Sequence, residues 1–195
     1  MLTIPENAPF TGTQRMWLKG YLAGIAAGLP QAGPPTAAAP AAEAPKSGLP
    51  VTILWGSQTG TAESYAKKLS KALAAQGHTP SIVDMADATV ERLSAIKHLL
   101  ILTSTYGDGE PPDNALALHT ALHTESPALA ELNFAIFALG DSNYPEFCKC
   151  GHDFQNRLNQ LGAKAILPIM TSDVDHDLPF KEWSSSVLSS LVIVH

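Results

Sequence analysis

The feature that most constrains the fold is a regular alternation of short apolar runs with longer segments suited to helices. The apolar runs have the length of strands and occur at 51–55, 81–85, 98–103, 133–139 and 165–169. The segments suited to helices are 60–76, 113–123, 150–161 and one that begins near residue 179. Nearly continuous apolar runs are typical of strands covered on both faces, and strand followed by helix, repeated, predicts a parallel sheet. We therefore expect an α/β fold with five parallel strands and helices on both faces.

The first 49 residues show a different sequence pattern. Residues 11–28 predict a short helix, because an apolar stripe at helical spacing includes Trp17, Tyr21 and Ile25. A segment of almost pure Pro and Ala follows, which predicts an extended and fairly stiff spacer. We therefore divide the chain into a helical partner or oligomerisation segment (1–28), a linker (29–49) and an α/β domain (50–195).

Charge and cysteine content narrow the possible partners. The formal net charge is -6 and the pI is about 5.6, which disfavours binding to nucleic acid or to an anionic membrane surface. Cys148 and Cys150 are too close for an unstrained disulfide, and no apolar run approaches the ~20 residues that span a bilayer. We expect a cytoplasmic protein without a secretory signal, and the histidines show no spacing typical of a metal site.

The loop after the first predicted strand has the composition of a phosphate cradle. It reads GSQTGTAES, with Gly56 and Gly60 for tight turning and hydroxyl donors at Ser57, Thr59 and Thr61, just where a helix begins. No lysine follows Gly60, as a nucleotide P-loop would need, and the G-x-G-x-x-G spacing of dinucleotide sites is absent. The residues favour a terminal monophosphate without a metal; an ordinary helix start is the alternative.

Two further loops follow the third and fourth predicted strands, and each carries one tyrosine. STYGDGEPPDN contains Tyr106, and LGDSNYPEFC contains Tyr144. The carboxyl ends of parallel strands share one edge of a sheet, so both tyrosines lie at the edge of the phosphate cradle, where they could flank a flat ring. A monophosphate at one end and a flat, polar-edged ring at the other describe FMN.

These three stretches, in this order and spacing, resemble the FMN domain of the diflavin reductases over residues 50–192. The resemblance is closest to sulfite reductase flavoprotein subunits, since it includes YPEFCKCGHDF, residues 11–28 and the Pro/Ala linker. It implies a flavodoxin-like fold with strand order 2-1-3-4-5. Matched residue by residue, it also implies cofactor-binding positions in each loop. These are Ser57, Gln58, Thr59, Gly60, Thr61 and Ala62; Ser104, Thr105, Tyr106 and Gly107; and Leu139, Gly140, Asp141, Asn143, Tyr144, Phe147 and Cys148.

The resemblance implies one-electron transfer, in which electrons pass from NADPH through FAD to FMN and then to a haem protein. The haem protein would be the sulfite reductase haemoprotein, and the FAD and NADPH sites would lie outside this chain, which by itself is not expected to oxidise NADPH. Three alternatives stay open: the FMN domain of a cytochrome reductase or a free-standing shuttle, a self-sufficient FMN quinone reductase, and a flavin-free interaction module.

Acidic residues occur in every loop at the predicted binding edge, and such a rim suggests docking of a basic electron acceptor. They are Asp108, Glu110, Asp113, Asp141, Glu146, Asp173, Asp175 and Asp177.

Overall fold

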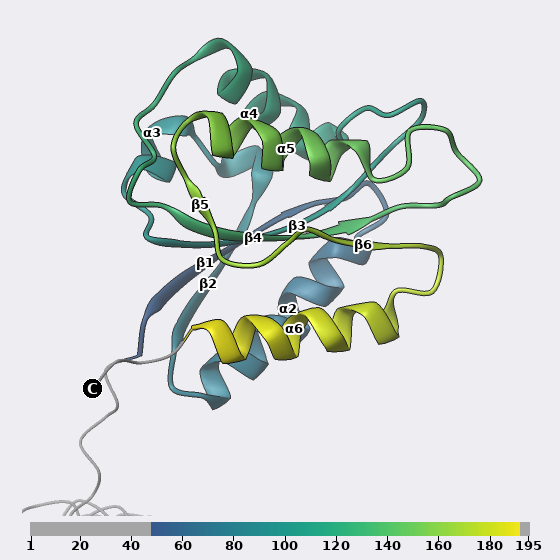
Figure 1. Ribbon diagram of the computed structural model, residues 1–195. Coiled ribbons are helices and arrows are strands. Elements are labelled where there is room, and N and C mark those ends of the chain that lie inside the picture. The colour runs from purple at the N-terminus through teal and green to yellow at the C-terminus, as the bar shows by residue number, and fades with distance from the viewer. Residues whose placement is uncertain (1–47, 192–195) are drawn as a thin grey trace, which may run out of the picture. The chain divides into compact units, whose positions relative to one another are not determined.

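The computed structural model describes residues 48–191, which form an alternating α/β domain (Figure 1). The strands are β1 (Pro50–Gly56), β2 (Thr79–Asp84), β3 (His98–Ser104), β4 (Asn133–Leu139), β5 (Lys164–Ala165) and β6 (Met170–Ser172). The helices are α2 (Thr61–Ala75), the 3-10 turn η1 (Met85–Asp87), α3 (Val90–Ser94), α4 (Asp113–Thr124), α5 (Lys149–Gln160) and α6 (Asp177–Ser190). The predicted helical segment 1–28 and the linker up to residue 47 lie outside the described residues, so those assignments stay predictions.

The strands pair in parallel in the order β2-β1-β3-β4-β5, which confirms the predicted 2-1-3-4-5 arrangement. Ile53 of β1 lies opposite Ile82 of β2 on one side and Leu100 of β3 on the other. The order along the sheet therefore changes direction between β1 and β3. A ligand site is expected beyond the carboxyl ends of these two strands.

The predicted fifth strand at 165–169 is wrong in its detail, because the chain pairs with β4 in two short pieces. Ala165 lies opposite Phe134, and Met170 lies opposite Phe137. Four residues separate Ala165 from Met170, whereas only two separate Phe134 from Phe137 on β4. The chain must therefore leave the ladder between the two pieces. Pro168 lies in this interval and has no N–H to donate to a ladder.

The sheet has one apolar core on each face. Alternate residues of β3 point to opposite faces: Leu99 and Ile101 pack with α3, α4 and α5, whereas Leu100 and Leu102 pack with α2 and α6. Figure 1 shows these two helical layers above and below the sheet. Both faces of the central strands are thus covered, which explains their nearly continuous apolar sequences.

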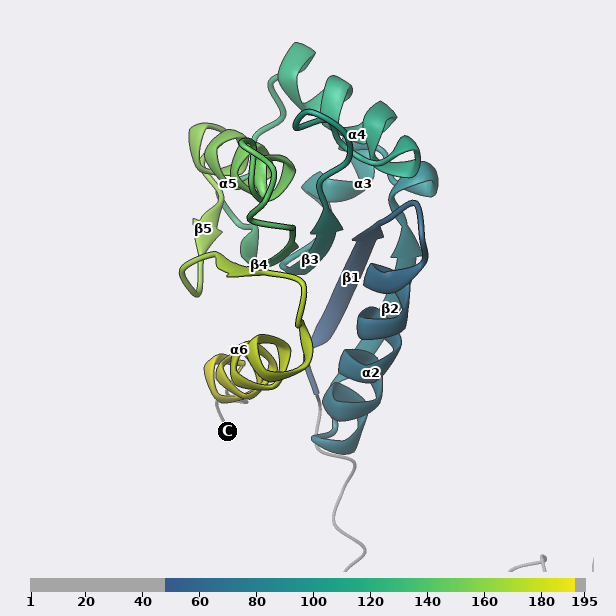
Figure 2. The ribbon, with the colours of Figure 1, turned by 90° about the vertical axis from the view of Figure 1, so that its right-hand side faces the viewer.

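Figure 2 views the domain from the side on which the loops after β1, β3, β4 and β6 lie. The strands and helices hold these loops together at one edge of the sheet. Among residues 48–191, no helix combines the length and the apolar character that crossing a membrane requires.

Candidate functional site

The loop between β1 and α2 leaves a helix start open to a ligand. Gly60 has φ +78°, and nothing lies within 4 Å of the place where a Cβ would sit. No side chain caps α2, and its first backbone hydrogen bond runs from Ser64 N to Gly60 O at 3.0 Å. The preceding amides of the first turn are therefore donors without helical partners. The hydroxyls of Thr59 and Thr61 lie 3.0 Å apart beside them.

Asn114, the second residue of α4, ties this loop to the rest of the sheet. Its Oδ1 accepts a hydrogen bond from Ser57 N at 3.0 Å. Its Nδ2 donates to Asp84 Oδ1 at 2.8 Å and to Trp55 O at 3.3 Å. The Ser57 hydroxyl is buried and has no hydrogen-bond partner within the described part of the chain. The loop is thus held in place and retains an unused buried donor.

The loop after β3 folds into a compact turn. Tyr106 N donates to Glu110 O at 2.9 Å, and Tyr106 O accepts from Gly109 N and Glu110 N at 3.1 and 2.9 Å. Gly107 and Gly109 have φ of +51° and +110°, values that favour glycine. A Cβ on Gly109 would lie 2.9 Å from the Cβ of Glu146, so this loop packs directly against the loop that follows β4.

The loop between β4 and α5 is organised by Asp141. Its Oδ1 accepts from Asn143 N at 2.9 Å and from Asn143 Nδ2 at 2.7 Å, and its carbonyl accepts from Tyr144 N at 3.1 Å. Ser142 bonds to Asp173, with its backbone N 3.0 Å from Asp173 Oδ1. The loops after β4 and β6 are therefore joined to each other.

Cys148 and Cys150 anchor the end of this loop as buried, unpaired thiols. Cys148 has φ +55°, the one left-handed non-glycine residue within 48–191, and its Sγ lies 3.4 Å from Ala138 O. Burial raises the pKa of the Cys148 thiol to about 11 and that of Cys150 to about 12. Both thiols are neutral near pH 7, in keeping with the structural role expected of a packed cysteine.

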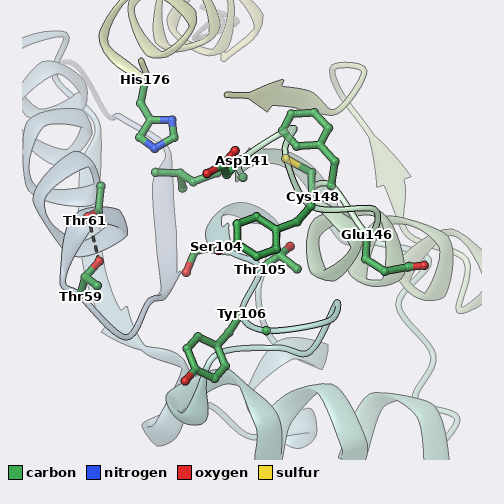
Figure 3. A pocket seen from close by; sticks show the side chains of 14 residues that line it. Thr59, Thr61, Ser104, Thr105, Tyr106, Asp141, Glu146, Cys148 and His176 are labelled. Carbon is green, nitrogen blue, oxygen red and sulfur yellow. Dashed lines mark hydrogen bonds between the residues drawn. The ribbon is translucent and has the colours of Figure 1, made fainter. Parts of the chain in front are cut away.

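The three loops and the segment after β6 enclose a cavity of about 480 Å³, a size typical of ligand sites (Figure 3). Its lining consists of Thr59, Thr61, Ser104, Thr105, Tyr106, Gly107, Leu139, Gly140, Asp141, Tyr144, Glu146, Phe147, Cys148 and His176. Tyr106 and Tyr144 are 54% and 57% exposed, so much of each ring is free to contact a ligand.

Of the seventeen cofactor-binding residues predicted from the sequence, the cavity brings together twelve. The other five are Ser57, Gln58, Gly60, Ala62 and Asn143, which belong to the same loops but do not line the cavity. Sequence reasoning missed two lining residues, Glu146 and His176. His176 follows the fifth predicted strand at the binding edge, and that position was the available signal.

His176 is half-buried and held from two sides. Its Nδ1 lies 2.8 Å from the hydroxyl of Ser172, which ends β6. Its ring meets that of Tyr65 on α2 edge-on, at 84° with centroids 6.2 Å apart. Burial lowers the pKa of His176, and the carboxylates of Asp175 and Asp173 oppose that shift in part.

Two of the exposed carboxylates in the predicted acidic rim also make hydrogen bonds. Asp108 and Glu110 are exposed in the loop after β3. Asp177 binds the hydroxyl of Tyr65 at 2.9 Å, and its pKa is lowered by that hydrogen bond and by Lys68. Hydrogen bonds from Ser142 lower the pKa of Asp173. Asp173 and Asp177 are therefore ionised near neutral pH, and their hydrogen bonds also hold neighbouring segments together.

A family model and curated relatives both match most of this chain. The family model described as flavodoxin matches residues 53–183. A sulfite reductase [NADPH] flavoprotein alpha-component of Bacillus subtilis (strain 168) is 42% identical over 188 residues, which are 93% of this chain and 30% of that protein. The namesake of Thiocapsa roseopersicina is 40% identical, over 93% of this chain and 33% of that protein.

Solved structures agree with the family match. A cysteine-to-alanine mutant of flavodoxin from Pseudomonas aeruginosa has a TM-score of 0.66 and 32% identity, and the match covers 73% of this chain and 99% of that one. By contrast, the chain spans only about a third of the length of the curated relatives it matches.

Proposed function

The chain belongs to the flavodoxin family, and from this premise we propose that it passes electrons through FMN from a reductase module to a haem protein. The observation that carries the proposal is the meeting of three strand-end loops around one cavity, with an uncapped helix start at one side and two exposed tyrosines. A flavodoxin domain binds FMN, and the residues present fit that group.

The residues of the site suit the phosphate group of FMN most clearly. The first turn of α2 offers unpaired amides, Gly60 leaves free space where a Cβ would sit, and the Ser57 hydroxyl is a buried donor without a described partner. A phosphate monoester carries several acceptor oxygens and nearly two negative charges, so it suits a cluster of donors at a helix N-terminus. Ser57, Gln58, Thr59, Gly60, Thr61 and Ala62 would hold it.

The flat ring suits the other side of the cavity. Tyr106 and Tyr144 would contact its faces, and Ser104, Thr105 and Gly107 would supply polar contacts to its edge. Leu139, Phe147 and the neutral Cys148 thiol form apolar lining that excludes water. When bound, the flavin supplies reversible electron acceptance and donation, while the protein sets its orientation and electrostatic surroundings.

The loops that would hold the ring are packed against each other. Cys150 N donates to Thr105 Oγ1 at 3.2 Å, and Gly109 packs on Glu146, so the loops after β3 and β4 support each other. Loops joined in this way would hold the ring in one orientation.

The names of similar proteins support the proposed direction of electron flow. Proteins named sulfite reductase [NADPH] flavoprotein alpha-component match nearly the whole chain at 42% and 40% identity. We therefore assign NADPH oxidation to an FAD module outside this chain and name the sulfite reductase haemoprotein as the acceptor. Exposed Asp108 and Glu110 support docking of a basic surface beside the cavity.

The cofactor assignment is tested by substitution at the helix start. The purified chain should contain stoichiometric FMN and no FAD, and Thr59→Asp should place a carboxylate where the phosphate binds. Two like charges about 4 Å apart repel by roughly 4 kcal/mol at an effective dielectric constant of 20, so FMN affinity should fall at least about a hundredfold. Thr79→Asp, at the opposite end of the sheet, is the matched control and should retain FMN. Equal FMN retention in both variants would contradict the phosphate assignment.

The acceptor assignment needs a separate measurement. The chain, reduced chemically, is mixed in a stopped-flow instrument with sulfite reductase haemoprotein or with a cytochrome c for comparison. Faster haem reduction in the first case supports the proposed acceptor, and the reverse order favours a cytochrome reductase. The chain alone should not oxidise NADPH; if it does, a self-sufficient reductase is the better description.

A further inference from the structure

His176 places a titratable ring at the end of the cavity where the helix start lies. It lines the cavity together with Thr59 and Thr61, and Figure 3 shows its ring directed into the cavity. The ring comes from the segment between β6 and α6, which no other lining residue shares. This position adds a fourth segment to the three loops predicted from the sequence.

The charge of the lining makes this position unusual. Among the fourteen described residues that line the cavity, His176 is the one whose side chain can carry a positive charge. The other ionisable groups are the carboxyls of Asp141 and Glu146, two tyrosines and the Cys148 thiol. The helix dipole and neutral donors can also stabilise a phosphate in this cavity. The described lining contains no cationic side chain other than His176.

The contacts of the ring decide which nitrogen serves a ligand. Nδ1 is engaged with the Ser172 hydroxyl at 2.8 Å, and Tyr65 packs edge-on against the ring. Nε2 is therefore the nitrogen that remains for the cavity. In the neutral ring its role depends on the tautomer, whereas in the protonated ring both nitrogens donate.

We propose that His176 is a ligand of the FMN phosphate, to which Nε2 donates a hydrogen bond, and that FMN binds more tightly when the ring is protonated. This inference rests on the proposed function, because it needs FMN in the cavity. It goes further in assigning the phosphate a partner outside the loop between β1 and α2, and a dependence of affinity on pH.

The groups around the ring set the direction of that dependence. On its own segment lie Asp173, Asp175 and Asp177, which favour the protonated form, and burial opposes them and lowers the pKa overall. From α2 the ring faces Tyr65, whose pKa burial raises to about 12, so it is neutral.

Lys68, also on α2, is engaged by Asp177 at 3.3 Å, and Asp141 and Glu146 line the same cavity as the ring. A phosphate dianion beside Nε2 favours the charged ring, so its binding should raise the pKa of His176 and take up a proton. Affinity gained in this way is present at low pH and is lost as the pH rises through the pKa in the complex.

Two variants separate hydrogen bonding, charge and packing. His176→Gln keeps a neutral donor but cannot be protonated, and His176→Phe keeps a flat ring against Tyr65 without either nitrogen. His152→Gln, at an exposed histidine of α5 outside the cavity, is the matched control. FMN and riboflavin, which lacks the phosphate, are titrated into each apoprotein at about pH 6 and about pH 8.5, on either side of the ordinary histidine pKa.

We expect His176→Gln to weaken FMN binding about tenfold more at about pH 6 than at about pH 8.5, relative to the parent, since a charge-assisted hydrogen bond exceeds a neutral one by roughly that factor. His176→Phe should weaken FMN binding at both pH values. Riboflavin should bind equally to the parent and both variants. Because the phosphate itself titrates near pH 6 in every protein, the comparison between variant and parent removes that effect.

Three results would overturn the inference. If the parent and His176→Gln show the same pH dependence for FMN, the ring charge does not act on the ligand, although FMN binding itself stands. If riboflavin affinity falls together with FMN affinity, His176 acts through packing. If the parent binds neither flavin, the proposed function fails and the inference fails with it.

Discussion

Asn114→Ala tests whether the loop between β1 and α2 is shaped in advance for its ligand. The side chain of Asn114 joins Ser57 N, Trp55 O and Asp84 Oδ1 at 3.0, 3.3 and 2.8 Å. Alanine keeps the helical backbone of α4 and removes all three hydrogen bonds at once. The Ser57 amide is then left without its acceptor in a buried position.

The size of the effect follows from these contacts. A net contribution of about 0.5–1.5 kcal/mol per hydrogen bond gives roughly 1.5–4.5 kcal/mol for three. The lower part of that range is the better expectation, because Asp84 Oδ1 also accepts from Ala86 N at 2.9 Å and keeps one donor. We expect the free energy of unfolding of the apoprotein to fall by about 2–3 kcal/mol. FMN affinity should fall about tenfold or more, since binding must now order the loop.

The assay is urea unfolding of the apoprotein, together with FMN titration of the same samples. Asn133→Ala is the matched control, because Asn133 Nδ2 makes two longer bonds, to Lys97 O at 3.3 Å and Glu131 O at 3.4 Å, at the other end of the sheet. It should cost about 1 kcal/mol, the low end for two bonds, and leave FMN affinity unchanged. The reasoning is refuted if the two variants lose equal stability, or if Asn114→Ala binds FMN as tightly as the parent.

Three further predictions concern the rest of the binding edge. Gly140→Ala should lower the melting temperature and FMN affinity, because a Cβ there would lie 2.7 Å from the buried Cys148 Sγ; an unchanged melting curve would contradict this. The thiols of Cys148 and Cys150, with pKa values of about 11 and about 12, should resist a thiol reagent near pH 8 until the protein unfolds. Because these pKa values are raised on folding, the stability they contribute should be lost above about pH 9, and a flat alkaline stability profile would speak against it. Asp108→Asn with Glu110→Gln should slow electron delivery to a basic haem protein and weaken its salt dependence without altering the flavin spectrum, whereas an unchanged rate would move the docking face elsewhere.

The sequence predicted the layers of the fold because its central strands are nearly continuous apolar runs. Burial on both faces leaves few polar positions, so β3 and β4 could be identified from composition alone. The prediction from sequence was wrong in detail at the fifth strand, where the apolar run 165–169 looked uniform. Pairing there depends on register with β4, and the extra residues around Pro168 leave the ladder.

The residues of the candidate site were likewise predictable from the sequence only in part. Gly, Ser, Thr and Tyr in three loops after strands could be read as ligand-binding positions, because parallel strands bring their carboxyl ends to one edge. Asn114 could not be read in this way, since its partners lie 57, 59 and 30 residues away along the chain. His176 looked like one scattered histidine until the fold placed its ring in the cavity.

The distribution of charge around the cavity links binding to electron transfer. The lining offers neutral donors and one titratable ring to the proposed phosphate, and the carboxyl groups of Asp141 and Glu146 line the same cavity. Carboxylates beside a redox group disfavour added negative charge on it, so they should lower its reduction potential and make it a stronger electron donor. The same carboxyl groups, with exposed Asp108 and Glu110, would favour approach of the proposed basic acceptor to this side of the domain. In this proposal one acidic surface would both strengthen the donor and orient its partner, while the helix dipole, neutral donors and His176 would hold the phosphate.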